Sequence, residues 1–186
     1  MIRGLFILIV LFQIVGVTVS SQELSVPNGF KISPLLRSTH FVSDINESLK
    51  LYRDVLGLEI RVDIILENEL ANNVLGTKSK RVRAVVLKSG DLFNGGVGLF
   101  EFLGDTGDVQ ERKEAYAKPG DAVLVFITND IFGIHEKVKK DGYAIASDPI
   151  VLFPVEGKEA QDYEMLFFDR DGIGVNLIQR SLIRRN

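Results

Sequence analysis

Metal binding and nucleophilic catalysis in proteins rely heavily on cysteine and histidine, and this sequence is poor in both. The 186 residues contain no cysteine and two histidines, His40 and His135. The composition therefore excludes disulfides, cysteine-based zinc sites, iron–sulfur clusters, thiol nucleophiles and a three-histidine metal site within one chain. We expect His40 to be a hydrogen-bonded structural residue and His135, which has charged neighbours in a helix, to be solvated on the surface.

Three further segments resemble ligand-binding sequences only in part. Asp169-Arg-Asp-Gly172 begins like a calcium loop but lacks the later ligands, so we interpret it as a tight turn. The segment from Gly96 to Glu101 lacks the last glycine of a dinucleotide-binding fingerprint. We interpret a basic run as charge along a solvated strand edge rather than as an anion site. The run consists of Lys78, Lys80, Arg81 and Arg83.

The composition is that of a folded globular protein. Hydrophobic residues make up 46% of the chain and charged residues 25%, and the length predicts about one domain. The formal net charge is −3 and the pI is near 5.5, which argues against nucleic acid as the main partner.

The first 21 residues have the order of a secretory signal peptide. A short positive start that contains Arg3 precedes an apolar run from Leu5 to Val19, and small residues follow. Cleavage after Ser20 or Ser21 fits this pattern, and an uncleaved membrane anchor is the alternative. Residues 22–35 are then a polar leader. We expect an exported protein, in the periplasm or the extracellular space, with no membrane association after cleavage.

The rest of the chain contains one pattern of elements twice. In each copy a strand leads into a capped helix with an apolar stripe, and three strands follow. Asp44-Ile45 and Asp130-Ile131 begin the two helices at an offset of 86 residues. The expected strands are 37–42, 58–65, 82–87 and 96–102 in the first copy, and 122–127, 143–146, 165–168 and 174–178 in the second.

Two tandem βαβββ modules are the architecture that this order predicts. Module one spans 36–104, a linker covers 105–119, module two spans 120–181, and 182–186 form a tail. A helix covers one face of each module's sheet, so the other face is free. We expect an α+β fold in which a curved mixed sheet surrounds a cup, which is a natural site for a small molecule.

Three stretches resemble the vicinal oxygen chelate superfamily, which includes glyoxalase I, bleomycin-resistance proteins and extradiol dioxygenases. They are residues 37–57, like the family's opening strand, helix and Leu-Gly turn; 97–102, like its fourth strand; and 168–178, like its closing hairpin. The resemblance implies a glyoxalase-like fold over 36–181. It leaves the function open, because the superfamily includes several chemistries and some proteins that are not enzymes.

Metal-dependent members of this superfamily hold a divalent ion with four residues, usually two histidines and two glutamates. By resemblance, those positions fall here on Arg37, Glu101, Val123 and Asn176. Strand alternation turns His40 to the face opposite Arg37. One carboxylate, one amide and a fixed positive charge are poor ligands for a cation. We therefore expect no metal and no other cofactor at the family site.

The altered positions imply ligand binding more readily than metal chemistry. Arg37 and Asn176 can hold a carboxylate or phosphate, or Arg37 and Glu101 simply neutralise each other. Glu101 is also a candidate general base. The leading interpretation is an exported, metal-free protein that binds a small organic ligand, as in the drug-resistance branch. The alternatives are a metal-dependent enzyme of the lactoylglutathione lyase or dioxygenase type, and a non-catalytic structural or partner-binding module. The resemblance is also compatible with a homodimer.

Overall fold

The computed structural model describes residues 27–29, 31–67, 75, 79, 81–90, 95–104, 115–152 and 161–180. The predicted signal peptide, the tail and most of the predicted linker lie outside this part of the chain. So do Lys78 and Lys80 of the basic run.

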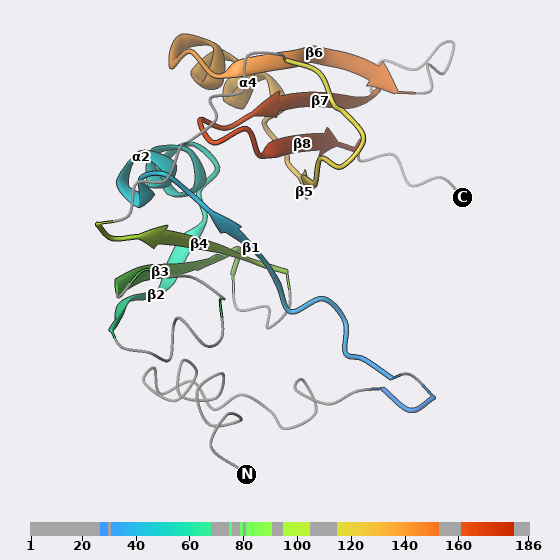
Figure 1. The fold of residues 1–186 in the computed structure, drawn as a ribbon. Helices are drawn as coiled ribbons and strands as arrows, with labels where there is room; N and C mark the ends of the chain where they lie inside the picture. Colours follow the sequence, from blue (N-terminus) through green and yellow to red (C-terminus); the bar gives the residue numbers. More distant parts are fainter. Residues whose placement is uncertain are drawn as a thin grey trace. The chain divides into compact units, whose positions relative to one another are not determined.

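The first sheet has four strands and begins with the residues of the predicted opening strand. Its strands are β1 (Arg37–Phe41), β2 (Glu59–Glu67), β3 (Arg81–Lys88) and β4 (Gly96–Phe102), in the order β1-β4-β3-β2 (Figure 1). β1 pairs with β4 in parallel, and the other neighbours are antiparallel. A mixed sheet is thus formed, as the sequence predicts.

The helical segment after β1 starts at the predicted cap. Asp44 accepts hydrogen bonds from the backbone amides of Asn46 and Glu47, at 2.7 and 3.2 Å. A short α-helix, α2 (Ile45–Leu49), continues into a π-helix, η1 (Lys50–Val55). Gly57 follows with φ +75°, the left-handed conformation that ends the segment without a Cβ clash.

The second sheet repeats the topology of the first. Its strands are β5 (Val123–Ile127), β6 (Ala144–Leu152), β7 (Asp162–Phe168) and β8 (Gly174–Gln179), in the order β5-β8-β7-β6. β5 pairs with β8 in parallel. The helix α4 (Ile131–Lys140) contacts β6, β7, β8 and η1. The element order therefore confirms two βαβββ modules.

The compact units differ from the modules in one respect. One unit consists of Met1–Phe41 and Gly57–Asp105, and the other of Val42–Leu56 and Thr106–Asn186. The first helical segment is therefore part of the unit that contains the second sheet, although the sequence places it in module one.

Each unit has its own set of buried hydrophobic residues. In the first unit, Val82, Ala84 and Phe100 form a buried cluster. In the second unit, the α4 residues Ile131 and Val138 are fully buried. Four residues on one face of the second sheet are at most 1% exposed: Met165, Phe167, Val175 and Leu177.

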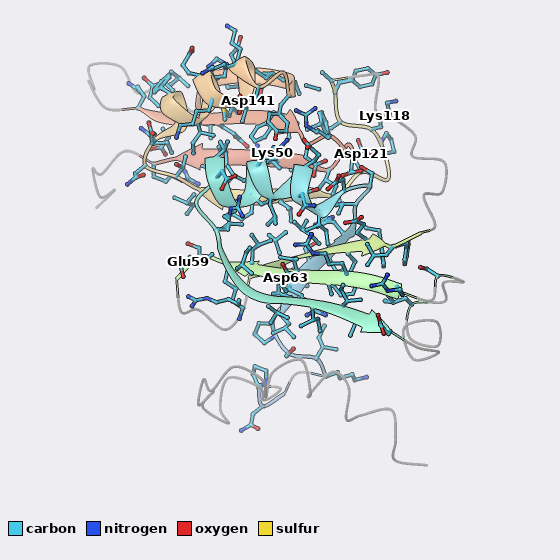
Figure 2. The ribbon with its side chains drawn as sticks, turned by 90° about the vertical axis from the view of Figure 1, so that its left-hand side faces the viewer. Lys50, Glu59, Asp63, Lys118, Asp121 and Asp141 are labelled. Atoms are coloured by element: carbon cyan, nitrogen blue, oxygen red, sulfur yellow. The ribbon has the colours of Figure 1, made fainter. Side chains whose placement is uncertain are left out.

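Two expectations about the strands need correction. β6 runs through Pro149 to Leu152 and does not end at Ala146, because an edge strand tolerates the missing N–H of proline. β3 is an interior strand, so Arg81 and Arg83 do not lie along a sheet edge. They form ion pairs with β2: Arg83 meets Asp63 at 2.7 Å, and Arg81 meets Glu67 at 3.1 Å. Glu59 and Asp63 lie along β2 in Figure 2.

His135 is also placed differently from the expectation. It is buried rather than solvated, and its Nε2 lies 2.7 Å from Oδ1 of Asp148 on β6. Its Nδ1 lies 3.4 Å from Glu136. The contact with Asp148 connects α4 to β6, whereas Glu136 is a neighbour of His135 on α4 itself.

The turn between β7 and β8 is organised by Asp169. Its Oδ1 accepts the backbone amides of Asp171 and Ile173 at 3.0 and 2.8 Å, and this confirms the interpretation of Asp169-Arg-Asp-Gly172 as a turn. Its Oδ2 accepts a hydrogen bond of 2.8 Å from the buried hydroxyl of Tyr52 on η1. Burial raises the pKa of Asp169 to about 6, although these hydrogen bonds oppose the shift.

We predict that Asp169→Asn flattens the dependence of stability on pH. A carboxyl whose pKa is raised by folding stabilises the protein fully below its unfolded pKa, and this contribution is lost as the pH rises through about 6. The wild-type free energy of unfolding should fall by at most roughly 3 kcal/mol from this group between pH 4 and pH 7. Denaturant unfolding at several pH values measures the difference. An identical slope in the variant would contradict the assignment.

Candidate functional site

One face of the first sheet brings together Arg37 and a set of aromatic rings. β1 and β4 pair Arg37 with Gly96, Thr39 with Gly98 and Phe41 with Phe100, so these side chains share a face. Phe41 meets Phe100 edge to face at a centroid distance of 6.0 Å. It also stacks on Phe102 at 5.2 Å.

Arg37 is half-buried on this face. Its Nε donates a hydrogen bond of 3.1 Å to Oγ1 of Thr39, and its guanidinium carbon lies 5.8 Å from the centroid of the Phe100 ring. Burial lowers the pKa of Arg37. Among the residues that the structure describes, no acidic side chain forms an ion pair with it.

A second cation lies across Gly96 from Arg37. β3 and β4 pair Val86 with Gly98, so Lys88 is the next position on the Arg37 face, beside Gly96. A Cβ atom built on Gly96 would lie 3.5 Å from Cβ of Arg37 and 3.6 Å from Cε of Lys88. The two basic side chains thus border a position that has no side chain of its own.

Glu101 and His40 lie on the opposite face from Arg37. The register pairs His40 with Leu99 and Arg83 with Glu101, which places both on the alternate side. The structure therefore does not bring Arg37 and Glu101 together, and their predicted mutual neutralisation is wrong. His40 has the expected structural role, because its Nε2 lies 2.9 Å from the Ser38 hydroxyl.

The second sheet repeats this register with different side chains. Val123 pairs with Gly174 as Arg37 pairs with Gly96, and Val125 pairs with Asn176 as Thr39 pairs with Gly98. In the repeated register, Asn176 of the second module is equivalent to Gly98 of the first module. Glu101, which the resemblance placed in the first module's site, is not equivalent to Asn176.

Asn176 has an incomplete set of hydrogen bonds. Its Nδ2 donates to Oε1 of Glu164 on β7 at 2.8 Å. Its Oδ1 is buried and has no hydrogen-bond partner among the residues that the structure describes. A buried carbonyl without a donor costs free energy, so this atom favours a ligand or partner that supplies an N–H or O–H.

The strand that pairs with Asn176 presents exposed apolar side chains. Val123, Val125 and Ile127 alternate along β5 on the same face and are 37, 61 and 77% exposed. Of the predicted site residues in this unit, Val123 and Asn176 thus lie on one face of the sheet. Apolar side chains around one unsatisfied polar atom are typical of a surface that binds organic molecules.

Glycine permits the close approach of the first and last strands in each sheet. A Cβ on Gly98 would lie 2.9 Å from Oγ1 of Thr39, and one on Gly174 would lie 2.9 Å from Cγ2 of Val123. Any larger residue would displace the β-branched side chain on the neighbouring strand, so these positions cannot carry a metal ligand without a local shift.

Comparison with known proteins agrees with the repeated fold. The family model of the Glyoxalase/Bleomycin resistance protein/Dioxygenase superfamily matches residues 35–177. The chain belongs to this superfamily. This membership confirms the resemblance seen in the sequence, and the superfamily's two-module fold is the one observed.

Solved structures show the same fold at low identity. A glyoxalase family protein from Bacillus cereus is 18% identical, with a TM-score of 0.64 over 82% of this chain and 97% of that one. Glyoxalase I from Zea mays is also 18% identical, with a TM-score of 0.55 over 80% of this chain. This chain spans 45% of the length of the maize protein. Among curated proteins no significant match is found.

The superfamily's metal does not fit the residues found here. The four positions supply a guanidinium, an aliphatic group, an amide and either Gly98 or the carboxylate of Glu101, which faces the other way. Within the described ranges, no group of three or more histidine, aspartate or glutamate side chains could hold an ion. The same residues include no helix long and apolar enough to cross a membrane.

Sequence reasoning missed Lys88, Thr39 and Glu164 as neighbours of the predicted residues. Thr39 could have been predicted from the sequence, because the alternation of side chains along β1 puts it on the same face as Arg37. The placement of Lys88 depends on the register between β3 and β4, and that of Glu164 on the register between β7 and β8. A single sequence does not reveal these registers.

We predict that Asn176→Asp destabilises the protein at pH 8 more than at pH 4.5. At pH 8 two carboxylates would face each other in place of a hydrogen bond, at a cost of roughly 1–3 kcal/mol, whereas a shared proton reduces the cost at low pH. Thermal unfolding at both pH values measures this effect.

Two controls accompany this variant. Asn46→Asp adds the same charge at an exposed position in the first turn of α2 and should be neutral or stabilising. The double variant Asn176→Asp with Glu164→Gln restores an amide–carboxylate pair and should recover stability. Equal losses at both pH values would refute the role of the pair.

Proposed function

We propose that this chain is an exported member of the superfamily that binds a small organic ligand without the metal of the catalytic branches. Binding or sequestration of the ligand is the function, and no chemical step is required. Export follows from the signal-like residues 1–21, which lie outside the described part of the structure.

The observation that carries this proposal is the buried Oδ1 of Asn176. It needs a donor, and the exposed β5 side chains around it offer apolar contact. A small molecule with an N–H or O–H group and an apolar body would satisfy both features. Glu164 holds the amide with its Nδ2 toward β7, so Oδ1 remains the atom that accepts from the ligand.

The enzyme alternatives lack the groups that their chemistry needs. A lactoylglutathione lyase or a dioxygenase of this superfamily works through a metal, and the donors at the family positions do not fit a cation. Glu101, the candidate general base, lies on the face opposite Arg37. The solved relatives named above share the fold at 18% identity, and their activities do not transfer to this chain.

We predict that the purified protein binds no zinc, nickel or iron(II) with micromolar affinity. Isothermal titration of each metal tests this prediction. His135 is the control position, because binding that disappears in His135→Gln would take place at the α4–β6 contact and not at the family positions. Stoichiometric binding that disappears in Asn176→Ala or Glu101→Ala would contradict the proposal.

Native mass spectrometry provides the test for the ligand itself. We expect the wild type to retain a co-purified organic molecule. Asn176→Leu should reduce its occupancy at least about tenfold, because the ligand loses the buried hydrogen bond that Oδ1 of Asn176 accepts. The same spectrum tests whether the protein is a homodimer. A protein that carries a metal ion and no organic mass would overturn the proposal.

A further inference from the structure

We propose that Arg37, together with Lys88, binds the carboxylate of an apolar organic acid over Gly96. This inference rests on the proposed function and names the class of ligand. It derives from the first sheet, whereas the proposed function derives from Asn176 in the second.

The first argument is the charge balance of Arg37. Its guanidinium is half-buried and contacts only the Thr39 hydroxyl and the Phe100 ring among the described residues. A cation that is partly removed from water without a counterion raises the free energy of the folded state. An anionic ligand would remove this cost, whereas a neutral ligand would increase it.

The second argument is the geometry of the guanidinium. Nε donates to Thr39, and no described residue accepts a hydrogen bond from the two terminal nitrogens, so these remain for an acceptor. These nitrogens lie in one plane, and a planar carboxylate accepts two parallel hydrogen bonds from such a fork. The hydrogen bond to Thr39 also limits the rotation of the guanidinium.

The third argument is the place of the second cation. Arg37 and Lys88 lie on either side of Gly96, with Cα atoms about 10 Å apart across two strand spacings. Two like charges on one face repel each other, and an anion between them reverses the sign of that interaction. Glu59 pairs in register with Lys88 and also bonds Arg61 at 3.0 Å, so an acid is present on the Lys88 side. Among the described residues no acid pairs with Arg37, so an anion on this face gains most at its guanidinium.

The fourth argument is the aromatic surface beside the cations. Phe41, Phe100 and Phe102 lie on the same face, and Phe41 is 50% exposed. Flat apolar groups pack well against such rings. Phe100 is buried and β4 is covered at Gly96 and Gly98, so the exposed ring of Phe41 is the one that offers contact to a ligand.

The experiment compares 2-naphthoate with its neutral isostere 2-naphthamide on the purified protein, by isothermal titration. We expect naphthoate to bind at least about tenfold more tightly than naphthamide, because a charge-assisted hydrogen-bonded pair contributes that much. Arg37→Gln should abolish the preference, and Lys88→Gln should weaken naphthoate binding by a smaller factor. Inorganic phosphate should compete poorly, because it has no apolar body.

Two further variants control the result. Arg81→Gln removes a basic residue that lies on the opposite face of the same sheet and pairs with Glu67, so naphthoate affinity should not change. Gly96→Ala places a methyl group between the two cations and should weaken naphthoate more than naphthamide. Without ligand, Arg37→Gln should leave the melting temperature unchanged or raise it, because an unpaired half-buried charge is removed.

Several outcomes would overturn the inference. They are equal affinity for the two probes, unchanged naphthoate binding in Arg37→Gln, no binding of either probe, or a melting temperature that falls in Arg37→Gln as it would on the loss of an ion pair. None of these outcomes affects the proposed function if the wild type retains an organic ligand that depends on Asn176. Loss of that ligand together with a bound metal would instead refute the proposed function.

Discussion

The parallel pairing of the first and last strands of each sheet is the constraint on which the candidate sites depend. Side chains alternate between faces along a strand, so one register decides which residues can meet. Arg37 opposite Gly96 and Val123 opposite Gly174 give both sheets the same register. A slip by one residue would move Glu101 to the face of Arg37 and would move Asn176 away from the face of Val123.

The two modules use this common backbone for different chemistry. The first sheet presents two basic side chains and three aromatic rings around glycine, and the second presents an amide–carboxylate pair among aliphatic side chains. In neither sheet do the described residues form a group of acidic and imidazole ligands. A superfamily known for chelation thus includes a chain whose faces suit hydrogen bonds and apolar contact, which illustrates why fold alone does not assign function.

The sequence predicted the fold well because its local signals are strong. The caps at Asp44 and Asp130, the glycine at position 57 and the Asp169 turn all have the predicted structure. The site was predicted less well, because Glu101 was assigned by resemblance, and one residue of offset in a strand reverses the face. The partners of His135 and Asn176 lie on other strands, and only the tertiary register brings them together.

The hydrogen bond between Tyr52 and Asp169 joins residues that are 117 positions apart. At a synthesis rate of 5–20 residues per second, Asp169 is added to the chain about 6 to 23 seconds after Tyr52, and the helical segment of residues 45–55 has no such acceptor before then. A cut between the two sequence repeats would leave that segment on one fragment and its compact unit on the other. The repeats are therefore not interchangeable building blocks, and the nascent chain matures only after its last hairpin has emerged.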